Sequence, residues 1–338
     1  MTEPIIRVKD LSVRFPLERG KTIQACHNVT FEVGERGTMG LVGESGSGKT
    51  TVGRALVGLV KPNSGEIWFR DQRIDNLKPS VFRPMRKNIQ MVFQEAYDSL
   101  DPRQTVVQVL EEPLKLHGMD SKTERRARVS ELLTQVGLPL RVAGARPAEL
   151  SAGDQQRVCI SRALATGPDF VVLDEPTSNL PPDAEMEIIE LLNELQAELG
   201  LSYLFISHDL NLVKQFCDTV AVMYLSQIVE VGNRDDIFAQ TKHPYSWALL
   251  QSVLWPDPRM RQTSLANRLR LSGEIPSPID LPVGCYLAGR CPFAVDRCRV
   301  ELQELREYSA DHLVRCWRTV EGEVSLDTLI GANKAMSS

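Results

Sequence analysis

The sequence predicts an α/β protein with a parallel-sheet core, a β-rich N-terminal part and a small C-terminal domain. Three observations predict this fold class. Helix-like and strand-like segments alternate over residues 155–205, a pattern typical of a parallel α/β core. A short apolar run at 38–42 stops at a glycine-rich segment, and a helix-like segment follows. After about residue 235 prolines become frequent, and four of the seven cysteines gather in the last sixth of the chain, which indicates a separate C-terminal domain.

Composition sets the broad class of the protein. The 338 residues are 42% hydrophobic and 25% charged, with a net charge of −5, which is ordinary for a globular protein of about two domains. An acidic balance disfavours a general nucleic-acid binder. No apolar stretch approaches the roughly 20 residues of a membrane-spanning helix. The first residues show no basic region followed by an apolar core, so we expect a cytoplasmic protein.

The elements follow in order along the chain. Residues 5–33 are β-rich around a turn at 17–21, which predicts antiparallel strands. Two stretches within residues 95–150, at 106–116 and 122–136, show helical periodicity with many charges. The remaining predicted helices and strands are a strand at 38–42, a helix at 51–60, a strand at 66–69, a helix at 156–165, a strand at 170–173, a helix at 184–199 and a strand at 203–207.

A phosphate-binding loop is predicted by the run Gly43-Glu44-Ser45-Gly46-Ser47-Gly48-Lys49-Thr50, which fits the pattern G-x-x-x-x-G-K-[ST]. Its glycines let successive backbone N–H groups point at phosphate oxygens. The following helix adds the positive end of its dipole. Lys49 would neutralise the β- and γ-phosphates, and the Thr50 hydroxyl can bind Mg²⁺. The strand before the loop and the helix after it disfavour the alternative, a flexible glycine loop without a ligand.

Three polar residues follow predicted parallel strands. Asp174 and Glu175 end the strand at 170–173: the first is placed to hold Mg²⁺, and the second to deprotonate the attacking water. His208 follows the strand at 203–207 and is placed to contact the γ-phosphate. Taken alone, the two acids could be surface residues before Pro176, and a lone histidine is more often structural. The phosphate loop upstream favours the functional interpretation of all three.

Together these features resemble the ATP-binding subunits of ABC transporters over essentially the whole chain. The resemblance implies a P-loop NTPase fold with a RecA-like core, an antiparallel β subdomain and a helical subdomain inserted at about 95–155. It implies an ABC domain over 1–240 and a C-terminal domain over 241–338. The site residues that it adds are Gln94 beside Mg²⁺ and the attacking water, Phe15 stacked on adenine unless it is a core residue, Thr51 after the phosphate loop, and Ser151 and Gly153 of the signature segment.

Four segments narrow the resemblance to the oligopeptide/dipeptide importers: residues 91–102, 243–250 and 273–278, and the cysteine-containing tail. This branch implies an ATPase that energises import of peptides or related small solutes from the cytoplasmic face of the inner membrane. Its implied partners are a second paralogous ATPase, two integral membrane permeases and a periplasmic or extracellular substrate-binding protein, with no nucleic acid.

The tail cysteines are separated by five, six and seventeen residues, at Cys285, Cys291, Cys298 and Cys316. Four thiolates suit an iron–sulfur cluster or zinc equally well by softness, and free buried cysteines are a third interpretation. The resemblance implies a four-iron four-sulfur cluster here, besides ATP and Mg²⁺.

The signature segment departs from the family pattern. Ala152 replaces its first glycine, Asp154 replaces its glutamine, and Pro181 stands where the D-loop has aspartate. Ser151 and Gly153 would touch the γ-phosphate held by a partner subunit, so that borrowed site would bind ATP but hydrolyse it slowly. This predicts an asymmetric heterodimer. The alternatives are that the substitutions are tolerated, that the chain is a regulatory subunit with little hydrolysis, or that it is a non-transport ABC ATPase.

Overall fold

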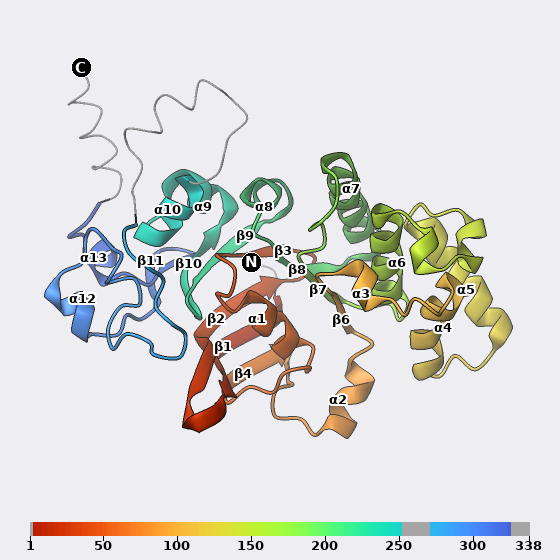
Figure 1. Cartoon of the computed structure of the whole chain (residues 1–338), viewed down its shortest axis with the longest axis horizontal. Coiled ribbons are helices and arrows are strands. Elements are labelled where there is room, and N and C mark those ends of the chain that lie inside the picture. The colour runs from red at the N-terminus through yellow and green to blue at the C-terminus, as the bar shows by residue number, and fades with distance from the viewer. Residues whose placement is uncertain (1–2, 252–270, 326–338) are drawn as a thin grey trace, which may run out of the picture.

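The computed structural model describes residues 3–251 and 271–325, which form two sheets with helices around them (Figure 1). The four-stranded antiparallel sheet has the order β2-β1-β4-β5, with β1 Pro4–Pro16, β2 Thr22–Gly34, β4 Ser64–Phe69 and β5 Gln72–Arg73. The eight-stranded sheet has the order β11-β12-β10-β9-β3-β8-β7-β6, with β3 Thr38–Val42, β6 Ile89–Val92, β7 Phe170–Asp174, β8 Ser202–Ile206, β9 Thr219–Tyr224, β10 Gln227–Asn233, β11 Arg306–Ser309 and β12 His312–Val314.

The centre of the large sheet is parallel, as the alternation of helices and strands predicts. Strands β6, β7, β8, β3 and β9 pair in parallel. Both faces are buried, because Phe170 and Val172 enter the core shared with the antiparallel sheet, while Val171 and Leu173 enter the core shared with the helices. Parallel sheets covered on both faces carry such continuous apolar runs. The sheet therefore presents the ends of β3, β7 and β8 along one edge.

The helices cover the large sheet and form one lobe beyond it (Figure 1). Their bounds are α1 Lys49–Leu56, α2 Pro79–Met85, α3 Ala96–Ser99, α4 Val106–Leu116, α5 Lys122–Gln135, α6 Ala152–Leu164, α7 Pro182–Leu199, α8 Leu210–Phe216, α9 Arg234–Gln240, α10 Pro244–Gln251, α12 Asp296–Val300 and α13 Trp317–Val320. The prediction of a helix at 51–60 was wrong at its end, because Gly58 takes a left-handed conformation with φ +68°. In the described ranges no helix is long and apolar enough to cross a membrane.

The lobe beyond the sheet contains α4 and α5, at the bounds that helical periodicity predicts to within one residue. Thr105 caps α4 in a reciprocal pair with Gln108, which satisfies the free N–H groups at its start. Ser121 caps α5 by accepting from the N–H of Glu124. The caps fix where both helices begin.

The C-terminal segment joins the core sheet, because β12 pairs antiparallel with β10. The buried Arg315 guanidinium reinforces this joint by donating to the carbonyls of Ile228, Gln303 and Asn28 at 2.6, 3.0 and 3.1 Å. The described C-terminal segment, residues 271–325, is thus joined to the core sheet by hydrogen bonds. The domain boundary at residue 240 stays a prediction.

Candidate nucleotide site

The predicted phosphate loop connects β3 to α1, at the edge where the parallel strands end. Gly43 and Gly48 have φ of +153° and +108°, and a Cβ at either position would lie 2.1 Å from a backbone carbonyl oxygen, of Met223 and Ala25 respectively. Any side chain would therefore push the loop out of place. The glycine pattern is required by the loop's packing, and it leaves the backbone in a compact turn before α1.

Lys49 lies inside this loop and is 5% exposed. Its ammonium group donates to the carbonyl oxygens of Gly43 at 2.9 Å and Glu44 at 3.0 Å. Burial lowers the pKa of Lys49, and the negative charges of Glu175, Asp174 and Glu44 oppose that shift. The loop thus holds a positive charge ready for an anion.

Thr50 and Asp174 form the hydroxyl–carboxylate pair that a magnesium site requires. The Thr50 hydroxyl donates to Asp174 Oδ1 at 3.0 Å, and Asp174 is 1% exposed at the end of β7. Burial raises the pKa of Asp174, partly offset by the hydrogen bond from Thr50. Both groups are hard oxygen donors, which Mg²⁺ prefers.

Glu175 gathers two other predicted residues around its carboxylate. Its Oε2 accepts from Gln94 Nε2 at 3.1 Å and lies 3.4 Å from His208 Nδ1. Glu175 also has φ +47°, a left-handed conformation that is uncommon outside glycine. Its N–H donates to the Ile206 carbonyl at 2.9 Å, and the Ser178 hydroxyl donates to its carbonyl at 2.9 Å, so the strained turn is held at both ends. Three chain segments therefore converge on one carboxylate.

The other predicted residues lie on separate elements. Phe15 is partly exposed near the end of β1, opposite Ile23. Ser151 caps α6 by accepting from the N–H of Asp154 at 3.1 Å. A Cβ added to Gly153 would meet Ala184 at 3.8 Å and no other atom within 4 Å in the described residues, so packing inside this chain does not require glycine there. The roles predicted for these residues stay predictions.

Two residues that sequence reasoning missed contact the phosphate loop from the C-terminal part of the chain. The Tyr245 hydroxyl accepts from the N–H of Glu44 at 3.1 Å, and Arg290 lies 3.9 Å from the Glu44 carboxylate. Tyr245 belongs to a segment that carried the family resemblance, and Arg290 precedes Cys291. Nothing in their spacing indicates that they reach the loop.

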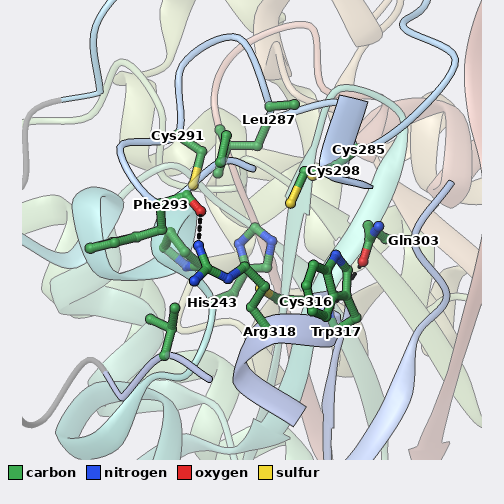
Figure 2. Close-up of a pocket in the computed structure, with 14 residues that line it drawn as sticks. His243, Cys285, Leu287, Cys291, Phe293, Cys298, Gln303, Cys316, Trp317 and Arg318 are labelled. Atoms are coloured by element: carbon green, nitrogen blue, oxygen red, sulfur yellow. Dashed lines mark hydrogen bonds between the residues drawn. The ribbon is translucent and has the colours of Figure 1, made fainter. Parts of the chain in front are cut away.

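The four tail cysteines surround one hollow, with His243 and Trp317 alongside (Figure 2). Burial raises the pKa of Cys285 to about 12 and that of Cys291 to about 11, so these thiols stay protonated at neutral pH without a metal. All seven cysteines are free. Within 3–251 and 271–325 no group of three or more His, Cys, Asp or Glu side chains is arranged to hold one metal ion. The donor set suits a metal, but its placement does not converge on a single ion.

A groove opens between α3, α4 and α6 beside the site. Its lining includes Gln94, Glu95, Asp98 and Leu116. The hydrogen bond and negative charge of Asp98 raise the pKa of Glu95, and Leu116 is exposed. The groove thus combines acidic and apolar side chains with Gln94, whose amide contacts Glu175 on the nucleotide side.

Two family descriptions match the chain. The ABC transporter family matches residues 26–178, and the C-terminal region of oligopeptide/dipeptide transporters matches residues 229–298. The first match spans the phosphate loop, Gln94, the signature segment and Glu175. The second spans Tyr245, Arg290 and three of the four tail cysteines.

Similar proteins and structures agree with these matches. The chain is 41% identical to the oligopeptide transport ATP-binding protein AppF of Bacillus subtilis, over 93% of this chain and 97% of that protein. It is 40% identical to a putative peptide import ATP-binding protein of Brucella ovis, over 94% and 99% of the two chains. The dimeric structure of the ATP-binding cassette MJ0796 bound to ADP and Pi is 30% identical, with a TM-score of 0.62 over 68% of this chain and 98% of that one.

The structure of cbiO1 from Clostridium perfringens, part of an ABC transporter complex, has the same identity and TM-score over 70% of this chain and 92% of that one. The fold expected from the sequence, an ABC ATPase with an antiparallel β subdomain, is confirmed. The chain therefore belongs to the ABC transporter family, among the ABC-type ATPase subunits of its oligopeptide/dipeptide branch.

Proposed function

We propose that this chain binds and hydrolyses MgATP to energise an importer of peptides or related small solutes. The observation that carries the proposal is that Lys49, the Thr50–Asp174 pair and the Glu175 carboxylate lie along one edge of the sheet. Each is held there by a hydrogen bond: Lys49 to the Gly43 carbonyl, Thr50 to Asp174, and Gln94 to Glu175. The names of the relatives, which specify oligopeptide and peptide import, support the kind of cargo.

The chain's own groups divide the chemistry between them. Lys49 would leave the carbonyls of Gly43 and Glu44 to pair with the β- and γ-phosphates. Thr50 and Asp174, with Gln94, would hold Mg²⁺, which when bound spreads the charge of the phosphates. Glu175 accepts the proton of the attacking water, while His208 steadies the γ-phosphate. Catalysis is then mainly positioning and electrostatic stabilisation.

A second ATPase subunit completes the site in this proposal. Gly153 supports a partner subunit, because contacts inside this chain leave room for a side chain at that position. A nucleotide held by the partner would occupy that room, which explains a glycine there. Ser151 at the start of α6 offers a hydroxyl and the positive helix end to such a phosphate. A coupling helix of one membrane permease would dock in the groove lined by Gln94, and the whole complex would hold two permeases fed by a periplasmic or extracellular binding protein. The chain would lie at the cytoplasmic face of the membrane.

The two ATP sites of such a pair would differ. The site on Lys49 and Glu175 keeps its catalytic groups, whereas the borrowed site receives Ala152 and Asp154 of this chain. Asp154 would bring a negative charge toward phosphate, a repulsion on the order of 1 kcal/mol in water at 4 Å and several in a partly buried site. We propose a heterodimer in which the borrowed site binds ATP and hydrolyses it slowly.

The four-cysteine hollow is the proposed place of an iron–sulfur cluster. The support is that Cys285, Cys291, Cys298 and Cys316 line one apolar hollow although 30 residues lie between the first and the last of them. A cluster accepts one thiolate per iron, so its cysteines need not converge on one ion.

Iron and sulfide analysis of the anaerobically purified chain tests this assignment. We expect about four irons per chain and visible absorption that bleaches on reduction, and we expect both to fall sharply in Cys291→Ser. Cys217→Ser, which alters a buried cysteine of the core, is the matched control and should keep its iron. Colourless protein without iron or sulfide would refute the cluster.

ATP-driven transport tests the proposed function. The complex of this chain with its partner ATPase and permeases is reconstituted in vesicles with the ATPases outside and with the binding protein and labelled peptide enclosed. We expect the peptide to leave the vesicles only when MgATP is added outside, and Lys49→Ala in this chain to abolish most transport. Transport that persists at the wild-type rate in that variant would contradict the proposal.

A further inference from the structure

We propose that Arg290, from the C-terminal part of the chain, is a positioning residue of the phosphate loop that sets its affinity for nucleotide by neutralising Glu44. The proposal rests on nucleotide binding at Lys49. It gives the C-terminal part a role in ATP binding that the ABC core match at residues 26–178 does not include.

Glu44 is held at three points. Its N–H donates to the Tyr245 hydroxyl at 3.1 Å, its carbonyl accepts from Lys49 Nζ at 3.0 Å, and its carboxylate lies 3.9 Å from Arg290 Nη1. Two of these three contacts come from beyond residue 240. The backbone that must wrap the phosphates is thus fastened to the C-terminal part of the chain.

Arg290 is itself fixed in place by aromatic rings. It donates to the Tyr224 hydroxyl at 3.3 Å, and its guanidinium lies 5.8 Å from the centre of the Tyr224 ring. The Tyr224 and Tyr245 rings are 4.5 Å apart, and both side chains are 1% exposed. A guanidinium held this way is pre-organised and stays charged.

The charge balance around Glu44 is tight. Among the described residues neither Glu44 Oε2 nor Arg290 Nε has a hydrogen-bond partner, although both atoms are buried. Their attraction is therefore mainly Coulombic, and it is partly screened by water because the Arg290 side chain is 12% exposed and the Glu44 side chain 34%. Lys49 also lies close to Glu44, and the negative charge of Glu44 opposes the lowering of the Lys49 pKa by burial.

Without Arg290 the Glu44 carboxylate would face the incoming triphosphate uncompensated and would compete with it for Lys49. With Arg290 in place, the Glu44 carboxylate is neutralised, and the positive charge of Lys49 is available to the phosphates. The C-terminal part thus sets the nucleotide affinity of the loop through the charge of Arg290 as well as through the Tyr245 hydrogen bond. Arg290 directly precedes Cys291 of the four-cysteine hollow.

A double-mutant cycle on the full chain tests the proposal, with MgADP binding measured by calorimetry. We expect Arg290→Met to weaken the Kd by roughly threefold to tenfold and Arg290→Lys to stay within about twofold. Glu44→Gln should bind more tightly than wild type, and Glu44→Gln/Arg290→Met should return close to wild type. The differences in Kd among these variants should become smaller at high salt, because salt screens the charges.

A purely structural role for Arg290 predicts a different pattern. In that case Arg290→Met would lose thermal stability and Glu44→Gln would not rescue binding; either an unchanged Kd or a loss without rescue overturns the proposal. Lys49→Ala separates this failure from failure of the nucleotide site itself, because the site is wrong only if that variant binds MgADP as well as wild type.

Discussion

Glu230 of β10 shows how a single residue joins distant segments. It is fully buried and accepts from the Thr241 hydroxyl and the Lys242 N–H, both at 2.6 Å, with His312 Nε2 2.8 Å away. Desolvation raises the pKa of Glu230, but the hydrogen bonds from His312, Thr241 and the Lys242 N–H outweigh it and leave the pKa lowered. The residue therefore stabilises the fold as a carboxylate.

Replacing Glu230 by Gln should reduce the free energy of unfolding by about 1–3 kcal/mol, because charge-assisted hydrogen bonds become ordinary ones. The pKa of Glu230 in the folded protein lies below its ordinary value of 4.5, so this stabilisation is present above about pH 4.5 and is lost as the pH falls through the folded pKa. Urea unfolding at several pH values measures it. The exposed Glu198→Gln on α7 is the control, with an expected change within about 0.5 kcal/mol; equal losses in both variants would contradict the account.

At the scale of residues the sequence could predict the phosphate loop and not its C-terminal supports. The glycine pattern predicts the loop because its packing excludes side chains at Gly43 and Gly48. Strand ends predict Asp174, Glu175 and His208 because parallel strands deliver their ends to one edge. The contacts of Arg290 and Tyr245 with Glu44 depend on how the tail folds back on the core, and local sequence carries no information on that.

The N-terminus of α6 is the element where stability and catalysis conflict. Asp154 lies in its first turn, where a negative charge favours the helix dipole, but the same charge opposes a phosphate from a partner. Pro181, before α7, has no N–H to offer. In the proposed heterodimer, Asp154 would thus stabilise α6 of this chain while the altered signature weakens the borrowed site.

Restoring Asp154→Gln and Pro181→Asp should raise ATP turnover in the reconstituted complex and raise the number of hydrolytically active sites from one to two. Pre-steady-state phosphate release counts those sites. Asp183→Asn in the first turn of α7 changes one charge nearby and serves as control, with little expected effect. No change in turnover or in active sites would remove the asymmetry.

Helices and strands could be predicted where the periodic pattern of apolar residues extends over many residues. Helices α4 and α5 run over 11 and 14 residues with clear periodicity, and the expected bounds agree with them. Strand β6 has four residues and β12 has three, too few for periodicity to indicate a strand. The pairing of β12 with β10, which joins the tail to the core sheet, was therefore not predictable.

In the whole molecule the phosphate loop lies between two regions that the mechanism could move. The helical lobe with α4 and α5 stands on one side of the core and the C-terminal segment with α12 and α13 on the other (Figure 1). Gln94 reaches Glu175 from the first side, and Arg290 reaches Glu44 from the second. The similarity to solved cassettes covers about two thirds of the chain. The contacts of Gln94 with Glu175 and of Arg290 with Glu44 both end on residues of the ABC core.

ATP turnover of the reconstituted complex with Glu175→Gln tests most directly the proposal that this chain's own site hydrolyses ATP when a companion subunit completes it. We expect turnover to fall by about 10²–10⁴-fold, as for loss of a general base, while MgATP binding persists and the nucleotide becomes trapped between the subunits. Near-normal turnover in that variant would contradict the assignment of Glu175 and, with it, the claim that this site drives transport.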